Sequence, residues 1–155
     1  MPDSELLDKL RIITAENSTR ATKAKKIADE IRKEGSWRWV GIYDVDFQRG
    51  LVVNIAWSGY SAPTHAAFPI TQGLTSRAIA GSRTINAGNV AEDSGYMTTF
   101  DSTRAEIIVP IFGHGDRVIG TLDVESEQLN AFDADAQALL EECACVLAEF
   151  WAMGR

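Results

Sequence analysis

Three carboxylate side chains fall on two neighbouring stretches of the chain that are both rich in isoleucine and valine. Glu106 belongs to the first stretch, residues 104–112, and Asp123 and Glu125 belong to the second, residues 117–126. Because side chains alternate between the two faces of a strand, Asp123 and Glu125 would share one face of a sheet. Carboxylates gathered in this way could bind an ammonium group or a divalent cation.

The two stretches are predicted to form a β-hairpin, because a glycine-containing turn, residues 113–116, separates them. An even-length turn would pair Phe112 with Arg117 and place Glu106 opposite Asp123. An odd-length turn would change this register unless a bulge restored it. Period-2 alternation puts one set of second-strand side chains on one face, namely Val118, Gly120, Leu122 and Val124. It puts the remaining set on the other face, namely Arg117, Ile119, Thr121, Asp123 and Glu125.

Like charges that face each other across a ladder are destabilising, so a cation is expected to offset these acids. The even register would place Arg104 opposite Glu125, and this internal arginine is one candidate. A ligand from outside the chain is the other. A third interpretation is that the acids form a solvated sheet face. The pattern alone leaves all three open.

Composition limits the classes of partner. The formal net charge is −7 and the pI is about 4.8, so nucleic acid and anionic membrane surfaces are not expected as partners. The chain begins without a basic and apolar leader, and no run approaches the ~20 apolar residues of a membrane span, so a cytoplasmic location is expected. Cys143 and Cys145 are two apart in a helical pattern, which is poor spacing for a disulfide. His65 and His114 are far apart, so no metal site and no cofactor is predicted.

Apolar residues at helical spacing predict two N-terminal helices within residues 4–34, broken at 17–19 and followed by Gly35 as the terminating residue. A C-terminal helix is expected over residues 132–151, with Asp133 as its N-cap. Between them, residues 37–126 contain the strands of the sheet and the pocket loops.

This central region is predicted to begin with a hairpin of strands 37–46 and 51–59, in which Gly50 takes a positive φ. Loop 59–69, a short helix 73–80 and a short strand 84–90 follow, and then a long connection leads to the acidic hairpin. We therefore expect one α+β domain over residues 1–155. Its antiparallel sheet carries the N- and C-terminal helices on one face and a loop-covered ligand pocket on the other.

Six segments of the chain carry a family resemblance, namely RWVGIYDVD, FPITQGLTSRAIA, NVAED, EIIVPIF, VIGTLDVES and FDADAQALL. Together they resemble the GAF domain, and more narrowly the small stand-alone GAF proteins of the free methionine-(R)-sulfoxide reductase family. The pair EIIVPIF and GTLDVES is similar to that family's SEIVxP and GxLDIDS. The resemblance implies that Glu106, Asp123 and Glu125 contact a free amino-acid substrate and that Trp39 lines the pocket.

Tyr43 lies four residues after Trp39, so it shares the same strand face and belongs to the candidate pocket. The resemblance also implies where a reductase would carry its cysteines. The matching positions in this chain are His65, Thr75 and about Thr99, and a threonine hydroxyl cannot form the disulfide that such a reaction requires.

These features predict a non-catalytic sensor or regulatory domain that binds a cationic or zwitterionic small molecule; a diverged reductase is the alternative. A carboxylate-rich pocket suits neither cyclic nucleotides, whose phosphate it would repel, nor bilins, which generally need a pocket cysteine. Divalent metal binding by the three acids and a pure assembly role remain further possibilities. The amphipathic terminal helices predict a homodimer, and a signal is expected to pass to a downstream signalling protein.

Overall fold

The computed structural model describes residues 2–93, 95–96 and 102–152. Its helices are α1 (Pro2–Ala15), α2 (Arg20–Gly35), α3 (Gly73–Gly81) and α4 (Ala134–Ala152), with short 3-10 turns η1 (Val90–Glu92) and η2 (His114–Asp116). Its strands are β1 (Trp39–Asp46), β2 (Leu51–Ser58), β3 (Ala67–Pro69), β4 (Ile85–Ala87), β5 (Ala105–Phe112) and β6 (Val118–Ser126).

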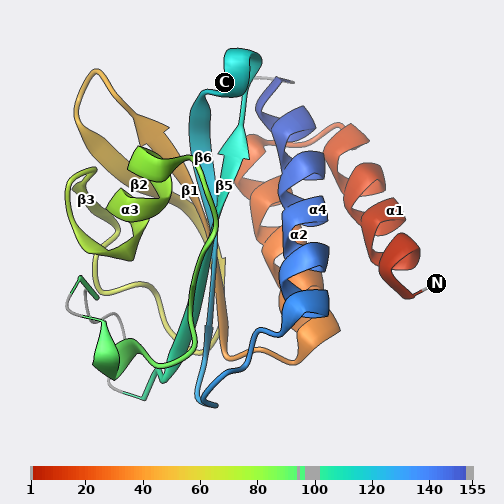
Figure 1. Cartoon of the computed structure of the whole chain (residues 1–155). Helices are drawn as coiled ribbons and strands as arrows, with labels where there is room; N and C mark the ends of the chain where they lie inside the picture. Colours follow the sequence, from red (N-terminus) through yellow and green to blue (C-terminus); the bar gives the residue numbers. More distant parts are fainter. Residues whose placement is uncertain (1, 94, 97–101, 153–155) are drawn as a thin grey trace.

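The strands form one antiparallel sheet in the order β3-β2-β1-β6-β5-β4. Helices α1, α2 and α4 lie on one face, and α3 lies on the other with the connecting loops (Figure 1). This arrangement confirms the predicted α+β architecture. None of the helices among the described residues combines the length and apolar character that a bilayer crossing requires.

The two N-terminal helices are separated where the sequence predicts. Thr19 caps α2, because its side chain accepts a hydrogen bond from the Thr22 backbone N–H. The predicted role of Gly35 is wrong in one respect, since the left-handed residue that ends the helix is Ser36, at φ 51°. Gly35 serves a packing need instead: a Cβ there would lie 2.2 Å from the Trp37 ring.

The sheet separates two apolar clusters. Val40 and Ile42 of β1 face the larger cluster, which contains the buried residues of α1, α2 and α4. Trp39 and Tyr43 face the smaller cluster on the opposite side. This alternation along β1 confirms the predicted division of its faces.

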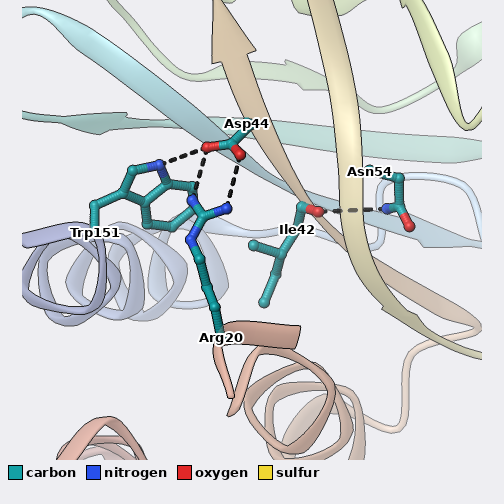
Figure 2. Close-up of polar contacts among 5 residues, drawn as sticks. All are labelled: Arg20, Ile42, Asp44, Asn54 and Trp151. Atoms are coloured by element: carbon teal, nitrogen blue, oxygen red, sulfur yellow. Dashed lines mark hydrogen bonds and ion pairs between the residues drawn. The ribbon is translucent and has the colours of Figure 1, made fainter. Parts of the chain in front are cut away.

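A β-bulge in β2 lies beside Tyr43 in the β1–β2 hairpin. The register shifts between Ile42 and Tyr43, so that Ile42 lies opposite Ala56 and Tyr43 opposite Asn54. The Asn54 side-chain amide donates to the Ile42 carbonyl at 3.4 Å (Figure 2). It also donates to the Ala56 carbonyl at 3.0 Å. The amide thus supplies a donor to carbonyl groups at the bulge.

The helix layer is tied to the sheet by one partly buried ion pair (Figure 2). Arg20, at the start of α2, donates from Nη1 and Nη2 to the Asp44 carboxylate of β1 at 2.8 and 2.7 Å. Trp151, near the end of α4, donates from its indole Nε1 to the same carboxylate at 2.9 Å. The Arg20 guanidinium also lies over the Phe150 and Trp151 rings, 5.4 and 5.1 Å from their centroids. Three separate elements therefore converge on one compensated charge.

The acidic hairpin forms, but its predicted register is wrong. Glu106 lies opposite Glu125, not Asp123, and Ile108 lies opposite Asp123. The cause is a register shift next to the turn, where Ile111 pairs with Gly120 and Phe112 with Val118. The turn contains two consecutive left-handed residues, Gly115 and Asp116.

The same shift moves two side chains to faces other than those predicted. Val118 packs with the Trp39 and Tyr43 cluster, whereas Ile119 packs against the helix-side core. Beyond the shift the predicted alternation holds, because Leu122 and Val124 also lie in the helix-side core. The loop predicted over residues 59–69 also contains the short strand β3, which pairs with β2.

Candidate functional site

A small cavity lies between the sheet and α3, on the face opposite the other helices. Strands β1, β5 and β6 supply its floor, and the segment from His65 to the first turn of α3 covers it. The lining residues are Tyr43, His65, Phe68, Gly73, Leu74, Thr75, Glu106, Asp123 and Glu125. Its volume of about 20 Å³ accommodates about one water molecule.

The strand register brings the three acids together. Glu106 of β5 lies directly opposite Glu125 of β6, and Asp123 is two residues before Glu125 on the same face. All three are buried, with exposed fractions of 6% for Glu106, 6% for Asp123 and 2% for Glu125. The predicted gathering of the carboxylates therefore occurs, although through a different register.

No internal cation compensates these acids within the part of the chain that the structure describes. Arg104, the internal candidate, has an exposed side chain and forms no salt bridge with any described residue. No described arginine or lysine lines the cavity. The internal ion-pair interpretation of Arg104 is therefore wrong, and so is that of a solvated sheet face.

Burial and mutual repulsion oppose ionisation of this cluster. Loss of hydration raises the pKa of Glu106 well above its ordinary value, and the charges of Glu125 and Asp123 and a hydrogen bond to Glu125 reinforce the shift. Loss of hydration also raises the pKa of Asp123, to about 8, with the Thr121 hydroxyl opposing and the Glu125 charge reinforcing it. At neutral pH the cavity therefore favours protonated acids or an added positive charge.

The hydrogen bonds of the acids are unequal. The Thr103 hydroxyl donates to Glu125 Oε1 at 2.7 Å, and both side chains are buried. In contrast, Asp123 Oδ1 and Thr121 Oγ1 are buried without a well-formed hydrogen bond to any described residue, although Thr121 lies close enough to influence the carboxyl. A buried oxygen without a partner is costly, so the cavity offers Asp123 to an entering donor.

Aromatic side chains form the wall beside the acids. Tyr43 lines the cavity and packs edge-on against Phe68, with ring centroids 5.8 Å apart. Trp39 does not line the cavity. It lies behind Tyr43, with ring centroids 6.5 Å apart, and its indole Nε1 donates to the Ser61 carbonyl at 3.1 Å. Burial raises the pKa of the Tyr43 hydroxyl well above its ordinary value, with the three acid charges reinforcing the shift. Tyr43 therefore remains a neutral phenol.

The remaining sequence candidates occupy different places. His65 and Thr75 both line the cavity, from the cover and from α3 respectively. Thr99 lies outside the described residues. Sequence reasoning missed Phe68 and Thr103; the alternation of β3 could have indicated Phe68, whereas a threonine in a long connection carries no such signal.

The two cysteines lie away from the residues that line this cavity. Cys143 is buried in the helix-side core, and Cys145 is exposed on α4. Neither lines the cavity. Among the described residues, no group of three histidine, cysteine or acidic side chains has a geometry suited to a metal ion.

A curled antiparallel sheet with an acidic cavity under a short helix defines a small-molecule-binding domain. The sequence profile of the GAF domain matches residues 19–149, and the chain belongs to this family. It is 28% identical over 127 residues to GAF domain-containing protein A of Dictyostelium discoideum, covering 79% of this chain and 74% of the relative.

Solved structures of two kinds share the fold. The free methionine-R-sulfoxide reductase of Neisseria meningitidis, solved with its substrate, superposes with a TM-score of 0.87 at 27% identity. That match covers 97% of this chain and 88% of the reductase. The GAF domain of an Acinetobacter phosphoenolpyruvate-protein phosphotransferase superposes with a TM-score of 0.83 at 15% identity, covering 96% of this chain and 92% of that domain. The fold therefore occurs both in a methionine sulfoxide reductase and in the GAF domain of a phosphotransferase.

Proposed function

We propose that this protein is a regulatory GAF domain that binds an amine or an amino acid through Glu106, Asp123 and Glu125. The observation that carries the proposal is a set of three buried carboxyl groups around a cavity that no described lysine or arginine lines. An ammonium group has three N–H donors and a positive charge, so it can satisfy the unpartnered oxygen of Asp123 and relieve the repulsion at once.

The ligand must enlarge the cavity, because a volume of about 20 Å³ holds about one water molecule. The sheet floor is braced by strand pairing on both sides, whereas the cover is a short segment between β3 and α3. Outward movement of this cover is the simplest way to admit a ligand. Such a movement would also change the surface that a downstream signalling protein could recognise.

The non-catalytic assignment follows from the position of the thiols. Sulfoxide reduction of this type needs a thiolate at the substrate. Cys143 and Cys145 lie on α4, on the opposite face of the sheet from the cavity. Binding without thiol chemistry is therefore the function that the geometry supports best.

A diverged reductase is the second candidate, and one observation favours it. The Neisseria reductase shares 27% of its aligned residues and nearly the whole fold with this chain. The two candidates differ in turnover, since only the enzyme consumes free methionine sulfoxide. They agree that the site accepts an amino acid.

The proposal can be tested by a thermal-shift screen of amino acids, amines and divalent ions, with L-methionine and methionine sulfoxide included. A ligand present at about 100 times its Kd stabilises a protein by about 2.7 kcal/mol, which produces a clear rise in Tm. Glu106→Gln and Asp123→Asn should each weaken a hit about tenfold. Glu92→Gln, at an exposed position in η1, is the matched control.

The proposal is contradicted if the wild type, Glu106→Gln and Asp123→Asn all bind the hit and its des-amino analogue with equal affinity. Thioredoxin-coupled consumption of methionine sulfoxide that survives replacement of both cysteines by serine would contradict the non-catalytic assignment. Consumption that is indistinguishable from a protein-free control is expected.

A further inference from the structure

Thr103 reaches the acidic cavity from the residues that lead into β5. Its side chain is 6% exposed, and its hydroxyl donates to Glu125 Oε1 at 2.7 Å. The backbone beside it is fixed, because the Arg104 N–H donates to the Ser126 carbonyl at 2.8 Å. The hydroxyl is therefore held against Glu125 by the sheet itself.

The other two acids are not served in this way. Asp123 lines the cavity, and its Oδ1 is buried and has no well-formed hydrogen bond to a described residue. Glu106 has its hydrogen bond with Glu125, which is another acid. Besides the acids, the described side chains with polar groups around the cavity are those of Tyr43, His65 and Thr75. The described lining therefore contains no lysine or arginine.

We propose that Thr103 is a positioning residue that keeps Glu125 ionised, that Glu106 and Asp123 carry the protons of the empty site, and that a cationic ligand enters by displacing the proton of Asp123 to solvent. The proposal rests on the proposed function, because it concerns how the same site takes its ligand.

The physical basis is that only one of the three neighbouring carboxyl groups is expected to be ionised in the empty site. Three negative charges around a cavity of about 20 Å³ repel one another strongly in a poorly hydrated site. A hydroxyl that donates to a carboxylate favours the charged form, so the donor from Thr103 selects Glu125. Glu106 can then donate its proton to Glu125, whereas the proton of Asp123 has no comparable acceptor and is the one most easily lost.

Proton and charge balance in the exchange. The empty site carries one negative charge, on Glu125. When an ammonium enters, the Asp123 carboxyl gives its proton to solvent, and the new carboxylate accepts an N–H of the ligand. The occupied site again carries one negative charge. Burial supports this direction, because it raises the pKa of Asp123 to about 8.

The empty protein provides the first test, by 13C NMR of the side-chain carboxyl carbons. Glu106→Gln, Asp123→Asn and Glu125→Gln assign the three signals. At pH 6.5 we expect Glu106 and Asp123 to be protonated and Glu125 to be ionised. Thr103→Val, which has nearly the same shape, should raise the titration midpoint of Glu125 by about one pH unit. Thr103→Ser, which keeps the hydroxyl group, should leave the midpoint of Glu125 at its wild-type value.

A Glu125 signal that is protonated in the wild type, or a midpoint that does not move in Thr103→Val, would overturn the proposal. If Thr103→Val does not fold, the wild-type protonation pattern and the Thr103→Ser variant still decide. A structural role alone would change stability in Thr103→Val but would leave the midpoint unchanged.

The second test uses L-methionine as the probe in calorimetry at pH 6.5, in two buffers of different ionisation enthalpy. Release of about one proton is expected, with affinity rising up to about tenfold per pH unit toward pH 8. In Asp123→Asn the proton release should disappear. Binding without proton release would overturn this inference and leave the proposed function standing. Failure of methionine and every amine to bind would refute the proposed function, while the NMR pattern would still decide where the protons reside.

Discussion

Asp44 and Asp123 lie on paired strands and face opposite sides of the same sheet. On the helix side, Asp44 receives two hydrogen bonds from Arg20 and one from Trp151. On the cavity side, no lysine or arginine among the described residues lines the cavity beside Asp123, and one oxygen of Asp123 has no well-formed hydrogen bond to a described residue. The same side-chain type is thus compensated on one face and left uncompensated on the other.

The difference indicates what each face is for. A compensated carboxylate fixes elements in place, since Asp44 joins α2, β1 and α4. An uncompensated one lowers the stability of the empty protein and reserves its interaction energy for a ligand. The helix face therefore serves stability, and the cavity face retains a cost that binding can relieve.

The largest expected effect comes from breaking the compensated pair. Arg20→Met would leave Asp44 without its cation and remove the guanidinium from the Phe150 and Trp151 rings. Because both partners are mostly buried, with side chains 22% and 23% exposed, we expect a loss of about 2–3 kcal/mol. Urea unfolding measures it.

The matched control is Lys25→Met, which removes an exposed i,i+4 pair with Asp29 and should cost less than about 0.5 kcal/mol. Similar losses in the two variants would contradict the assignment of Arg20 as the tie between the layers.

Asp123→Asn should have the opposite sign and a distinct pH dependence. The pKa of Asp123 is about 8 in the folded protein against 3.8 ordinarily. Between these values the folded protein holds a proton that the unfolded chain has lost, so the contribution of Asp123 to stability is complete below pH 4 and declines as pH rises toward 8. Asparagine does not titrate. The variant should therefore gain about 1 kcal/mol or more on the wild type between pH 5 and pH 8.

Unfolding free energies of both proteins at several pH values test this expectation. Asp44→Asn is the comparison variant, and it should be destabilised throughout the same range. A constant difference between Asp123→Asn and the wild type would show that Asp123 is ionised when the site is empty.

The sequence predicted the elements well because their signals are local. Helical spacing located α1, α2 and α4, and alternation placed Trp39 and Tyr43 on one face of β1. The register of the acidic hairpin could not be predicted, because it depends on the bulge at Ile119 and on a turn with two left-handed residues. The gathering of the acids survived this error, since the shift lies between the turn and the acids and leaves them on the same face.

Compensation of charge was equally beyond the sequence. Nothing in the chain order distinguishes Arg104, which is exposed, from Arg20, which is 24 residues from its partner Asp44. The role of Thr103 as the donor to Glu125 could not be predicted either, because Thr103 lies in a connection without periodicity. Long-range pairing of side chains is a property of the packed fold and not of local pattern.

The two cysteines both lie on α4, on the helix side of the sheet, but they differ in burial. Cys143 is fully buried in the helix-side core, so Cys143→Ser should cost about 1 kcal/mol by placing a hydroxyl among apolar side chains. Cys145→Ser, at an exposed position two residues away, should change stability by less than about 0.5 kcal/mol. Thermal unfolding separates the two. Neither variant should alter ligand affinity, and a change in affinity would place a thiol at the cavity.

The smallest expected effect on stability concerns Ile12, on α1, whose side chain is 67% exposed. We predict a homodimer formed through the terminal helices, with a mass twice the 17.0 kDa of one chain. A large apolar side chain exposed on such a helix is suited to an interface between copies. Ile12→Glu should therefore shift the protein toward the monomer, while the intrinsic stability of each chain changes by less than about 0.5 kcal/mol. Sedimentation at tens of micromolar gives the mass, and a wild-type monomer at that concentration would reject the dimer. A dimer that persists in Ile12→Glu would show that Ile12 of α1 is not essential to the interface between the two copies.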